Sequence, residues 1–114
     1  MAGFDEASTL FVYGNLLDER LQRELLGRTV STVPATLHDY ARERARFFYV
    51  TPRPGALTPG LLLLDLRSHD FATLDRYEEV PVLYLREKID VSAARGAIQR
   101  CWIYLPTPLT MRGG

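Results

Sequence analysis

Tyr13, Gly14, Asn15 and Leu16 follow an apolar run and precede a predicted helix. The first N–H groups of a helix have no helical partner, so this segment could bind a carboxylate or polarise a carbonyl oxygen. Gly14 lacks the Cβ atom that would hold a ligand away from the backbone. A tight strand-to-helix turn capped by Asn15 or Asp18 would account for the same residues. The segment is not a phosphate-binding P-loop, because it lacks that motif's spaced glycines and Gly-Lys-Ser/Thr ending.

Carboxylates close a second predicted helix, where Asp75, Glu78 and Glu79 follow Leu74 and Pro81 ends the helix. Carboxylates near a helix C-terminus oppose the helix dipole, so their presence there needs a reason. Two explanations stay open. The side chains point into solvent, or one of them is buried and held for proton transfer.

Tyr84 and Arg86 stand two residues apart in a predicted strand and therefore share one face. Arg86 could bind a carboxylate through two N–H groups, and Tyr84 could donate a hydrogen bond. A cross-strand pair on a solvated face is the alternative. We expect Arg42, Arg44 and Arg46 to form a solvated stripe, because no aromatic residues are interleaved with them on that face.

The histidines and the cysteine predict no further site. Neither His38 nor His69 has cysteines or carboxylates at metal-ligand spacing, so we expect no metal. Cys101 is the only cysteine, which excludes an intrachain disulfide, and its apolar strand predicts an inert core thiol.

Hydrophobic patterning predicts about six strands and two short helices around these residues. One helix runs from a cap at Asp18 to Leu26 and ends at Gly27, and a second begins at a Ser68 cap. A turn is predicted over Pro52–Gly55. The predicted strands are Thr9–Tyr13, Val30–Leu37, Arg42–Val50, Leu61–Leu66, Leu83–Val91 and Ala97–Leu105. Mostly consecutive strands favour an α+β domain with a mostly antiparallel, curved or closed sheet.

Composition is that of an ordinary globular domain. The chain has 114 residues, 46% of them hydrophobic, and its 14 basic and 14 acidic residues give no net charge. A nucleic-acid partner is disfavoured without a basic excess. We expect one soluble, cytoplasmic domain over residues 1–114, as a monomer or homodimer, with no targeting segment and no membrane span. Its core covers about residues 9–105, and residues 106–114 form a loose surface tail.

The order of the motifs resembles the gamma-glutamylcyclotransferase-like family over about Thr9 to Leu105. Leu10 to Leu16 resembles the family's opening LFVYGTL, and Ala35 to Tyr40 its A-x-L-x-G/D-Y segment. Pro52 to Leu66 is similar to its proline- and glycine-containing stretch, with Gly60 as the glycine. Leu74 to Glu78, followed by Tyr84-Leu85-Arg86, resembles LDxYEG…YxR, and Ile98–Leu105 resembles the closing strand.

The resemblance implies a six-stranded mixed or closed sheet and an enzyme that releases 5-oxoproline from gamma-glutamyl compounds. It implies that Glu78 is the catalytic acid/base and that the loop from Tyr13 to Leu16 holds the glutamyl group. Tyr84 and Arg86 remain the further candidate substrate-binding residues, on the side-chain chemistry and spacing given above. The substrate's α-amine attacks its own γ-carbonyl, a cyclisation that requires no metal or cofactor.

This sequence departs from the family pattern at two positions. Asn15 replaces a small hydroxyl residue after the loop glycine, and Glu79 replaces the glycine after the motif glutamate. Asn15 could narrow the pocket, and Glu79, if close, would raise the pKa of Glu78. A catalytically silent member that binds a small metabolite, or a protein-interaction module on the same fold, is the alternative to an enzyme.

Overall fold

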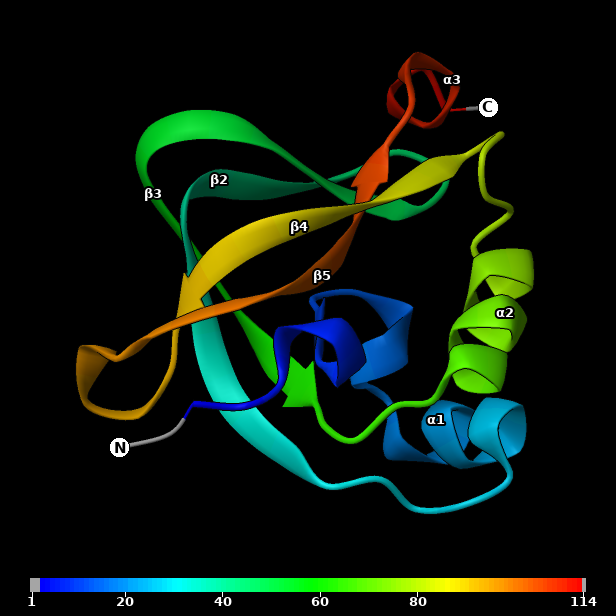
Figure 1. Ribbon diagram of the computed structural model, residues 1–114. Helices are drawn as coiled ribbons and strands as arrows, with labels where there is room; N and C mark the ends of the chain where they lie inside the picture. The colour runs from blue at the N-terminus through cyan, green and yellow to red at the C-terminus, as the bar shows by residue number, and fades with distance from the viewer. Residues whose placement is uncertain (1–2, 114) are drawn as a thin grey trace.

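The chain folds around a closed five-stranded barrel in the computed structural model, which describes residues 3–113. The strands follow the order β1-β3-β2-β4-β5 around the barrel (Figure 1). β1 pairs antiparallel with β3 and parallel with β5, so the sheet is mixed. The strands are β1 (Leu10–Val12), β2 (Thr32–Arg44), β3 (Phe48–Leu63), β4 (Tyr84–Ser92) and β5 (Ile98–Pro106). The expected α+β class and closed sheet are confirmed, with one strand fewer than predicted.

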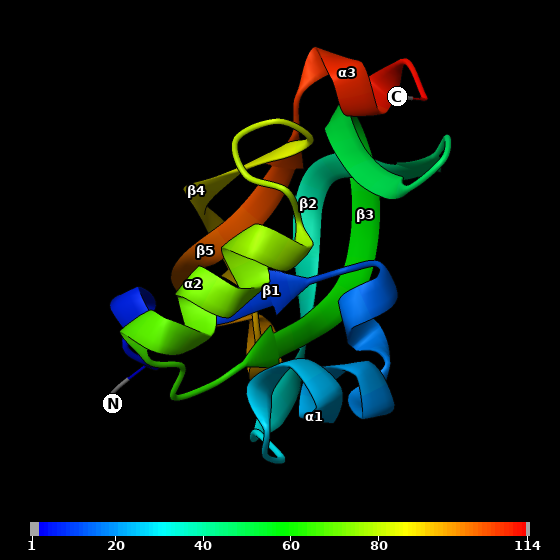
Figure 2. The same ribbon diagram turned by 90° about the vertical axis from the view of Figure 1, so that its right-hand side faces the viewer.

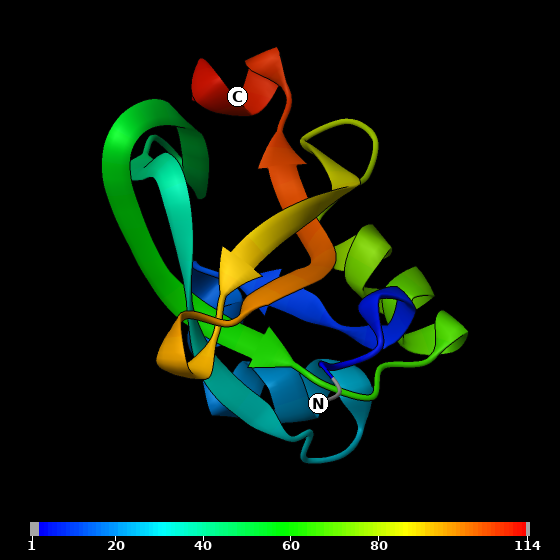
Figure 3. The same ribbon diagram turned by 60° about the vertical axis from the view of Figure 1, so that its left-hand side comes forward.

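The missing strand comes from the β2–β3 hairpin. The predicted strand Arg42–Val50 is wrong, because the chain turns in its middle, between Arg44 and Phe48. The predicted turn over Pro52–Gly55 is also wrong, since these residues lie within β3. They face a register shift between His38 and Tyr40, and β2 and β3 bend together as one long ribbon (Figure 3). Three predicted strands therefore become two.

Asp39 and Gly55 stabilise this irregular stretch of the hairpin. Both adopt left-handed backbone angles, with φ of 66° and 82°. The Asp39 carboxylate accepts a hydrogen bond from the Gly55 N–H at 2.8 Å. Pro52, Pro54 and Gly55 thus mark a distortion inside the hairpin. Prolines and glycines within strands are often found at such distortions.

The helices are largely those the local sequence predicts. α1 (Glu19–Leu26) has Asp18 as its N-cap, which accepts from Arg20 N at 2.9 Å, and left-handed Gly27 at its end. α2 (Ser68–Tyr77) begins one residue earlier than predicted, because Arg67 and not Ser68 is the N-cap. The Asp70 side chain accepts a hydrogen bond from the Arg67 N–H at 2.8 Å. A side chain of the helix itself thus binds the backbone of the N-cap residue and stabilises the first turn.

The buried apolar residues form two clusters around the strands of the barrel. One cluster contains Phe11, Leu37 and Ile103, and the other packs Leu10 and Leu63 against residues of α1 and α2. Figure 2 shows both helices beside β1. None of the helices within residues 3–113 has the length and apolar character needed to cross a membrane.

Gly60 allows β1 to lie close against β3. A Cβ atom at this position would stand 2.2 Å from the carbonyl oxygen of Val12 and 2.7 Å from the Phe11 ring. No side chain fits there, so Gly60 sets the position of the strand that leads into the Tyr13–Leu16 turn.

Residues 106–113 are attached to the domain, so the expectation of a loose tail over 106–114 is wrong for these residues, and position 114 lies outside the described residues. β5 continues to Pro106, and Pro108–Met111 forms the short helix α3. Thr110 is buried and donates its hydroxyl proton to the Leu83 carbonyl. Thr107 likewise donates to the Val82 carbonyl at 2.7 Å. These contacts fix the loop that joins α2 to β4.

Candidate active site

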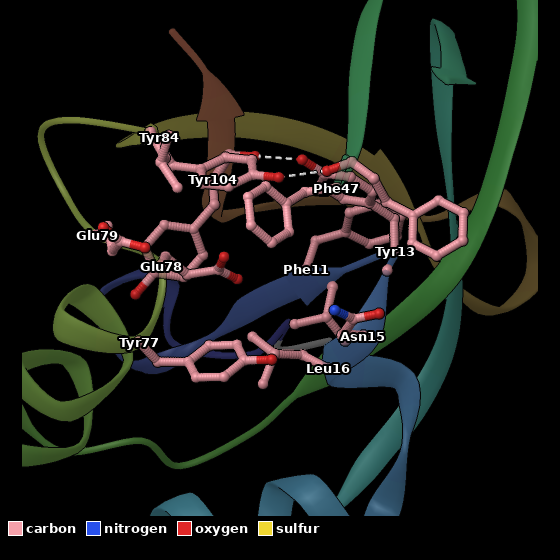
Figure 4. Close-up of a pocket in the computed structure, with 14 residues that line it drawn as sticks. Phe11, Tyr13, Asn15, Leu16, Phe47, Tyr77, Glu78, Glu79, Tyr84 and Tyr104 are labelled. Carbon is pink, nitrogen blue, oxygen red and sulfur yellow. Dashed lines mark hydrogen bonds between the residues drawn. The ribbon is translucent and has the colours of Figure 1, made fainter. Parts of the chain in front are cut away.

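A cavity of about 270 Å³ opens between the end of α2, the turn after β1, the tip of the β2–β3 hairpin and the start of β4. Figure 4 shows Glu78 and Glu79 on one side and Tyr13, Asn15 and Phe47 on the other. Segments about sixty residues apart in the sequence therefore meet here. The lining residues are Phe11, Val12, Tyr13, Gly14, Asn15, Leu16, Phe47, Phe48, Tyr77, Glu78, Glu79, Leu83, Tyr84 and Tyr104.

The turn after β1 forms a short 3-10 helix, Asn15–Leu17, with Gly14 at its start. Leu17 N–H donates to the Gly14 carbonyl at 3.0 Å, so the N–H groups of Asn15 and Leu16 have no partner inside this helix. A Cβ atom on Gly14 would lie 3.0 Å from the Phe48 Cβ, which is tighter than ordinary contact. Gly14 thus lets the turn approach Phe48 and close one wall of the cavity.

Glu78 lies at the C-terminal end of α2, where its backbone N–H donates to the Leu74 carbonyl at 2.8 Å. Its side chain is half-buried, and within residues 3–113 its carboxylate has no hydrogen-bond or ion-pair partner. Burial alone raises the pKa of Glu78 from 4.5 to about 7. Such a carboxyl group holds and releases a proton near neutral pH, as a general acid/base must.

Glu79 differs from its neighbour. It lies exposed at the cavity rim, with a left-handed backbone φ of 55°. This conformation favours glycine, the residue that the family pattern places here. Burial, rather than the second carboxylate, raises the pKa of Glu78.

Two buried tyrosines fix their phenol protons on backbone carbonyls. Tyr13 donates to the Tyr104 carbonyl at 2.6 Å, and Tyr84 donates to the Phe48 carbonyl (Figure 4). Tyr84 therefore does not offer a ligand the donated hydrogen bond that its sequence position suggested. Both phenol oxygens keep lone pairs, so toward a ligand they act as acceptors. Burial raises the pKa of both tyrosines and keeps them neutral.

Arg86 does not reach the cavity with the other predicted residues. Its Nε donates to Asp75 Oδ1 at 2.9 Å and its Nη2 to Oδ2 at 3.2 Å. The guanidinium also lies over the rings of Phe71 and Trp102, at 4.6 and 4.4 Å from their centroids. Tyr104 donates to the same Asp75 at 2.7 Å. Arg86 thus joins β4 to α2 from outside the site.

Sequence reasoning missed the aromatic walls of the cavity. Phe47 and Phe48 follow the unrecognised turn of the hairpin, and Tyr77 directly precedes Glu78. Tyr104 was assigned only to an apolar closing strand. Tyr77 could be identified as a cavity residue from the sequence, because it directly precedes the motif glutamate. Phe47 and Phe48 could be identified only by first locating the turn of the hairpin.

Comparison with known proteins gives one family. Residues 10–113 match the model of the family described as gamma-glutamyl cyclotransferase, AIG2-like. A Methanocaldococcus jannaschii protein named gamma-glutamylcyclotransferase and putative RNase is 26% identical over 99 residues, which are 84% of this chain and 45% of that protein. The Arabidopsis thaliana AIG2-like protein D is 30% identical over 94 residues, 80% of this chain and 60% of that protein. The chain thus spans about half the length of these relatives.

Solved structures share the fold. A structure named gamma-glutamyl cyclotransferase superposes with a TM-score of 0.79 at 18% identity, covering 88% of this chain and 66% of that one. An Arabidopsis thaliana solution structure gives 0.78 at 22% identity, covering 90% and 73% of the two chains. At these identities the likeness shows the fold alone.

Proposed function

Because this chain belongs to the gamma-glutamyl cyclotransferase, AIG2-like family, we propose that it releases 5-oxoproline and an amine from a small γ-glutamyl compound. Glu78 is the proton acceptor and donor of the reaction. The Tyr13–Leu16 turn holds the glutamyl group across the cavity from Glu78. The reaction joins two ends of one molecule, so positioning the substrate in a folded conformation supplies a large part of the rate.

The steps follow from the chemistry of the substrate. Its α-ammonium meets Glu78 and the acceptor oxygens of Tyr13 and Tyr84. Glu78 takes a proton, and the free amine attacks the γ-carbonyl carbon, forming a new C–N bond and an oxyanion. We assign the stabilisation of this oxyanion to the N–H groups of Asn15 and Leu16. Glu78 then delivers this proton to the departing nitrogen as the old amide C–N bond breaks and the oxyanion returns to a carbonyl. The ring nitrogen, which still carries two protons after the attack, releases one of them to solvent, so that the neutral lactam of 5-oxoproline forms and Glu78 is again a carboxylate.

The observation that carries the proposal is the environment of Glu78. Its carboxylate faces the cavity and has no ionic partner among residues 3–113, and burial raises its pKa to about 7. A structural carboxylate in an ion pair would have its pKa lowered instead, as Asp70 does beside Arg28. A proton can therefore move on and off Glu78 at neutral pH.

The test is to incubate the protein with a panel of γ-glutamyl amines and γ-glutamyl amino acids and to measure 5-oxoproline. We expect release by the wild type and a loss of about 10²-fold or more in Glu78→Gln, which keeps the shape but cannot accept the proton. Glu79→Gln is the matched control, since it removes the neighbouring exposed carboxylate, and it should retain most activity.

Two results would contradict the proposal. Equal losses in the two variants would show that the base is not Glu78. Absence of 5-oxoproline with every compound, together with binding of one of them, would show a metabolite-binding protein without cyclisation activity.

A further inference from the structure

Arginines at the end of β2 stack on the aromatic wall of the cavity. Arg42 and Arg44 are exposed, and each guanidinium lies 4.7 Å from the centre of the Phe48 ring, which lines the cavity. The guanidinium of Arg46 likewise lies 5.3 Å from the centre of the Phe47 ring. The expectation of a solvated stripe without aromatic contacts is thus corrected. Stacking on a ring limits the orientations that these long side chains adopt.

Arg42 differs from Arg44 by one contact with the turn after β1. The Nη1 of Arg42 donates a hydrogen bond to the Tyr13 carbonyl oxygen at 3.0 Å. The Arg44 side chain, over the same ring, makes no hydrogen bond within residues 3–113. A guanidinium is always charged, and a charged donor forms a stronger hydrogen bond with a carbonyl than a neutral donor does. Arg42 therefore binds the backbone of the turn firmly to the hairpin.

The peptide bond between Tyr13 and Gly14 transmits this contact toward the cavity. The bond is trans, so its carbonyl and its N–H group point in opposite directions. With the carbonyl held by Arg42, the Gly14 N–H is directed away from Arg42. Gly14 lines the cavity whereas Arg42 does not, and among the described residues the Gly14 N–H has no hydrogen-bond acceptor. A hydrogen bond to the carbonyl also polarises the peptide and strengthens its N–H as a donor.

Phe48 holds the same turn at a second point. A Cβ atom on Gly14 would lie 3.0 Å from the Phe48 Cβ, so the two residues are packed closely. The Phe48 carbonyl in turn accepts the phenol proton of Tyr84 from β4. The hairpin thus contacts the turn through the Arg42 guanidinium and through the Phe48 side chain, and only the first of these contacts fixes the orientation of a peptide group.

We propose that Arg42 is a positioning residue of the reaction, which holds the Tyr13 carbonyl and thereby orients the Gly14 N–H, together with those of Asn15 and Leu16, toward the oxyanion. This inference rests on the proposed function and adds to it a residue outside the cavity. Arg42 does not touch the substrate and acts through the peptide that it binds. Because the oxyanion exists only during the reaction, loss of this contact lowers turnover and leaves substrate binding nearly unchanged.

The experiment compares two arginines that share one aromatic ring. Arg42→Met removes the hydrogen bond to Tyr13 and keeps a long side chain on Phe48. Arg44→Met is the matched control, since it removes the same charge from the same ring without breaking a hydrogen bond. With a γ-glutamyl compound that the wild type cyclises, we expect Arg42→Met to lower kcat about tenfold and to change KM by less than about twofold. Arg44→Met should retain the kcat and KM of the wild type.

A second measurement follows the hydrogen bond without relying on activity. The ¹³C chemical shift of the Tyr13 carbonyl, measured by NMR on the full chain, should move upfield in Arg42→Met and stay unchanged in Arg44→Met. Arg42→Lys tests rescue, because a lysine ammonium can still donate to the carbonyl. If Arg42→Met does not fold, Arg42→Lys carries the test: its carbonyl shift and its kcat should either both stay at the wild-type values or both change.

Four results would overturn the inference and leave the proposed function standing. A wild-type kcat in a variant whose Tyr13 carbonyl shift has moved would make Arg42 a structural residue, and an unchanged shift in Arg42→Met would show that the contact is absent in solution. Equal losses of kcat in Arg42→Met and Arg44→Met would assign the effect to charge near the cavity. A raised KM with unchanged kcat would place Arg42 in contact with the substrate.

The wild type separates these results from a failure of the proposed function. If it releases no 5-oxoproline from any compound of the panel, the proposed function and the inference that rests on it are overturned together.

Discussion

Replacing Glu78 by glutamine should make the protein more stable at alkaline pH. Folding raises the pKa of Glu78 from 4.5 to about 7, so between these values the folded chain binds more protons than the unfolded chain. Stability then falls as pH rises through this interval, and the loss is complete above pH 7. The difference between the two pKa values corresponds to about 3 kcal/mol as an upper magnitude. Glutamine carries no charge and does not incur this loss.

Urea unfolding of the wild type and of Glu78→Gln between pH 4 and pH 8.5 measures the effect. Below pH 4.5 the two free energies of unfolding should be similar, because both side chains are neutral. At pH 8 the variant should be more stable by up to about 3 kcal/mol. A pH-independent difference, or a wild type that is the more stable protein at pH 8, would refute the reasoning and indicate a stabilising partner for the carboxylate.

Three further substitutions test the parts of the fold that position the site. Asp70→Asn should lower the free energy of unfolding by about 2 kcal/mol at pH 7, because Arg28 lowers the pKa of Asp70 to about 2 in the folded protein. The difference between the two proteins should disappear as pH falls from 4 toward 2, and urea titrations at several pH values measure it. Glu79→Gly should raise stability by about 0.5 kcal/mol by relieving the left-handed backbone, and a lower melting temperature would contradict this. Gly60→Ala should destabilise by about 3 kcal/mol through its clash with Val12, and unchanged thermal unfolding would show that β1 can move away.

Local signals predicted α1 and α2 well, whereas α3 was not predicted. The boundaries of α1 depend on Asp18 and Gly27, whose capping roles are set by neighbouring backbone atoms. The start of α2 was displaced by one residue, because the Asp70 side chain closes the first turn on Arg67 and Ser68 makes no cap. Capping is a short-range interaction, which is why sequence patterns find it.

The hairpin could not be predicted in the same way. The alternation from Arg42 to Val50 continues through a turn that contains neither glycine nor proline, so periodicity indicated a single strand. Pro52 and Gly55 gave a turn signal at a place where the structure has a distorted ladder opposite Asp39. The identity of a turn and of a bulge depends on cross-strand pairing, which the local sequence does not contain.

The candidate site likewise combines residues that sequence motifs identify with contacts that only the folded structure determines. The motif resemblance selected Glu78 and the residues from Tyr13 to Leu16, and these lie around one cavity. Arg86 was selected by its spacing from Tyr84, but its partner is Asp75 on α2, a contact made only by tertiary packing. The burial that raises the pKa of Glu78 likewise arises from segments far apart in the chain.

The pH dependence of 5-oxoproline release tests the role of Glu78 most directly. Measured as kcat/KM with a γ-glutamyl substrate, the rate should rise with pH along a limb centred near 7, where Glu78 loses its proton, before the substrate amine titrates at higher pH. Glu78→Gln should lose the activity across the whole range. A limb centred near 4.5, or a variant that retains the wild-type rate and pH profile, would contradict the assignment of Glu78 as the acid/base.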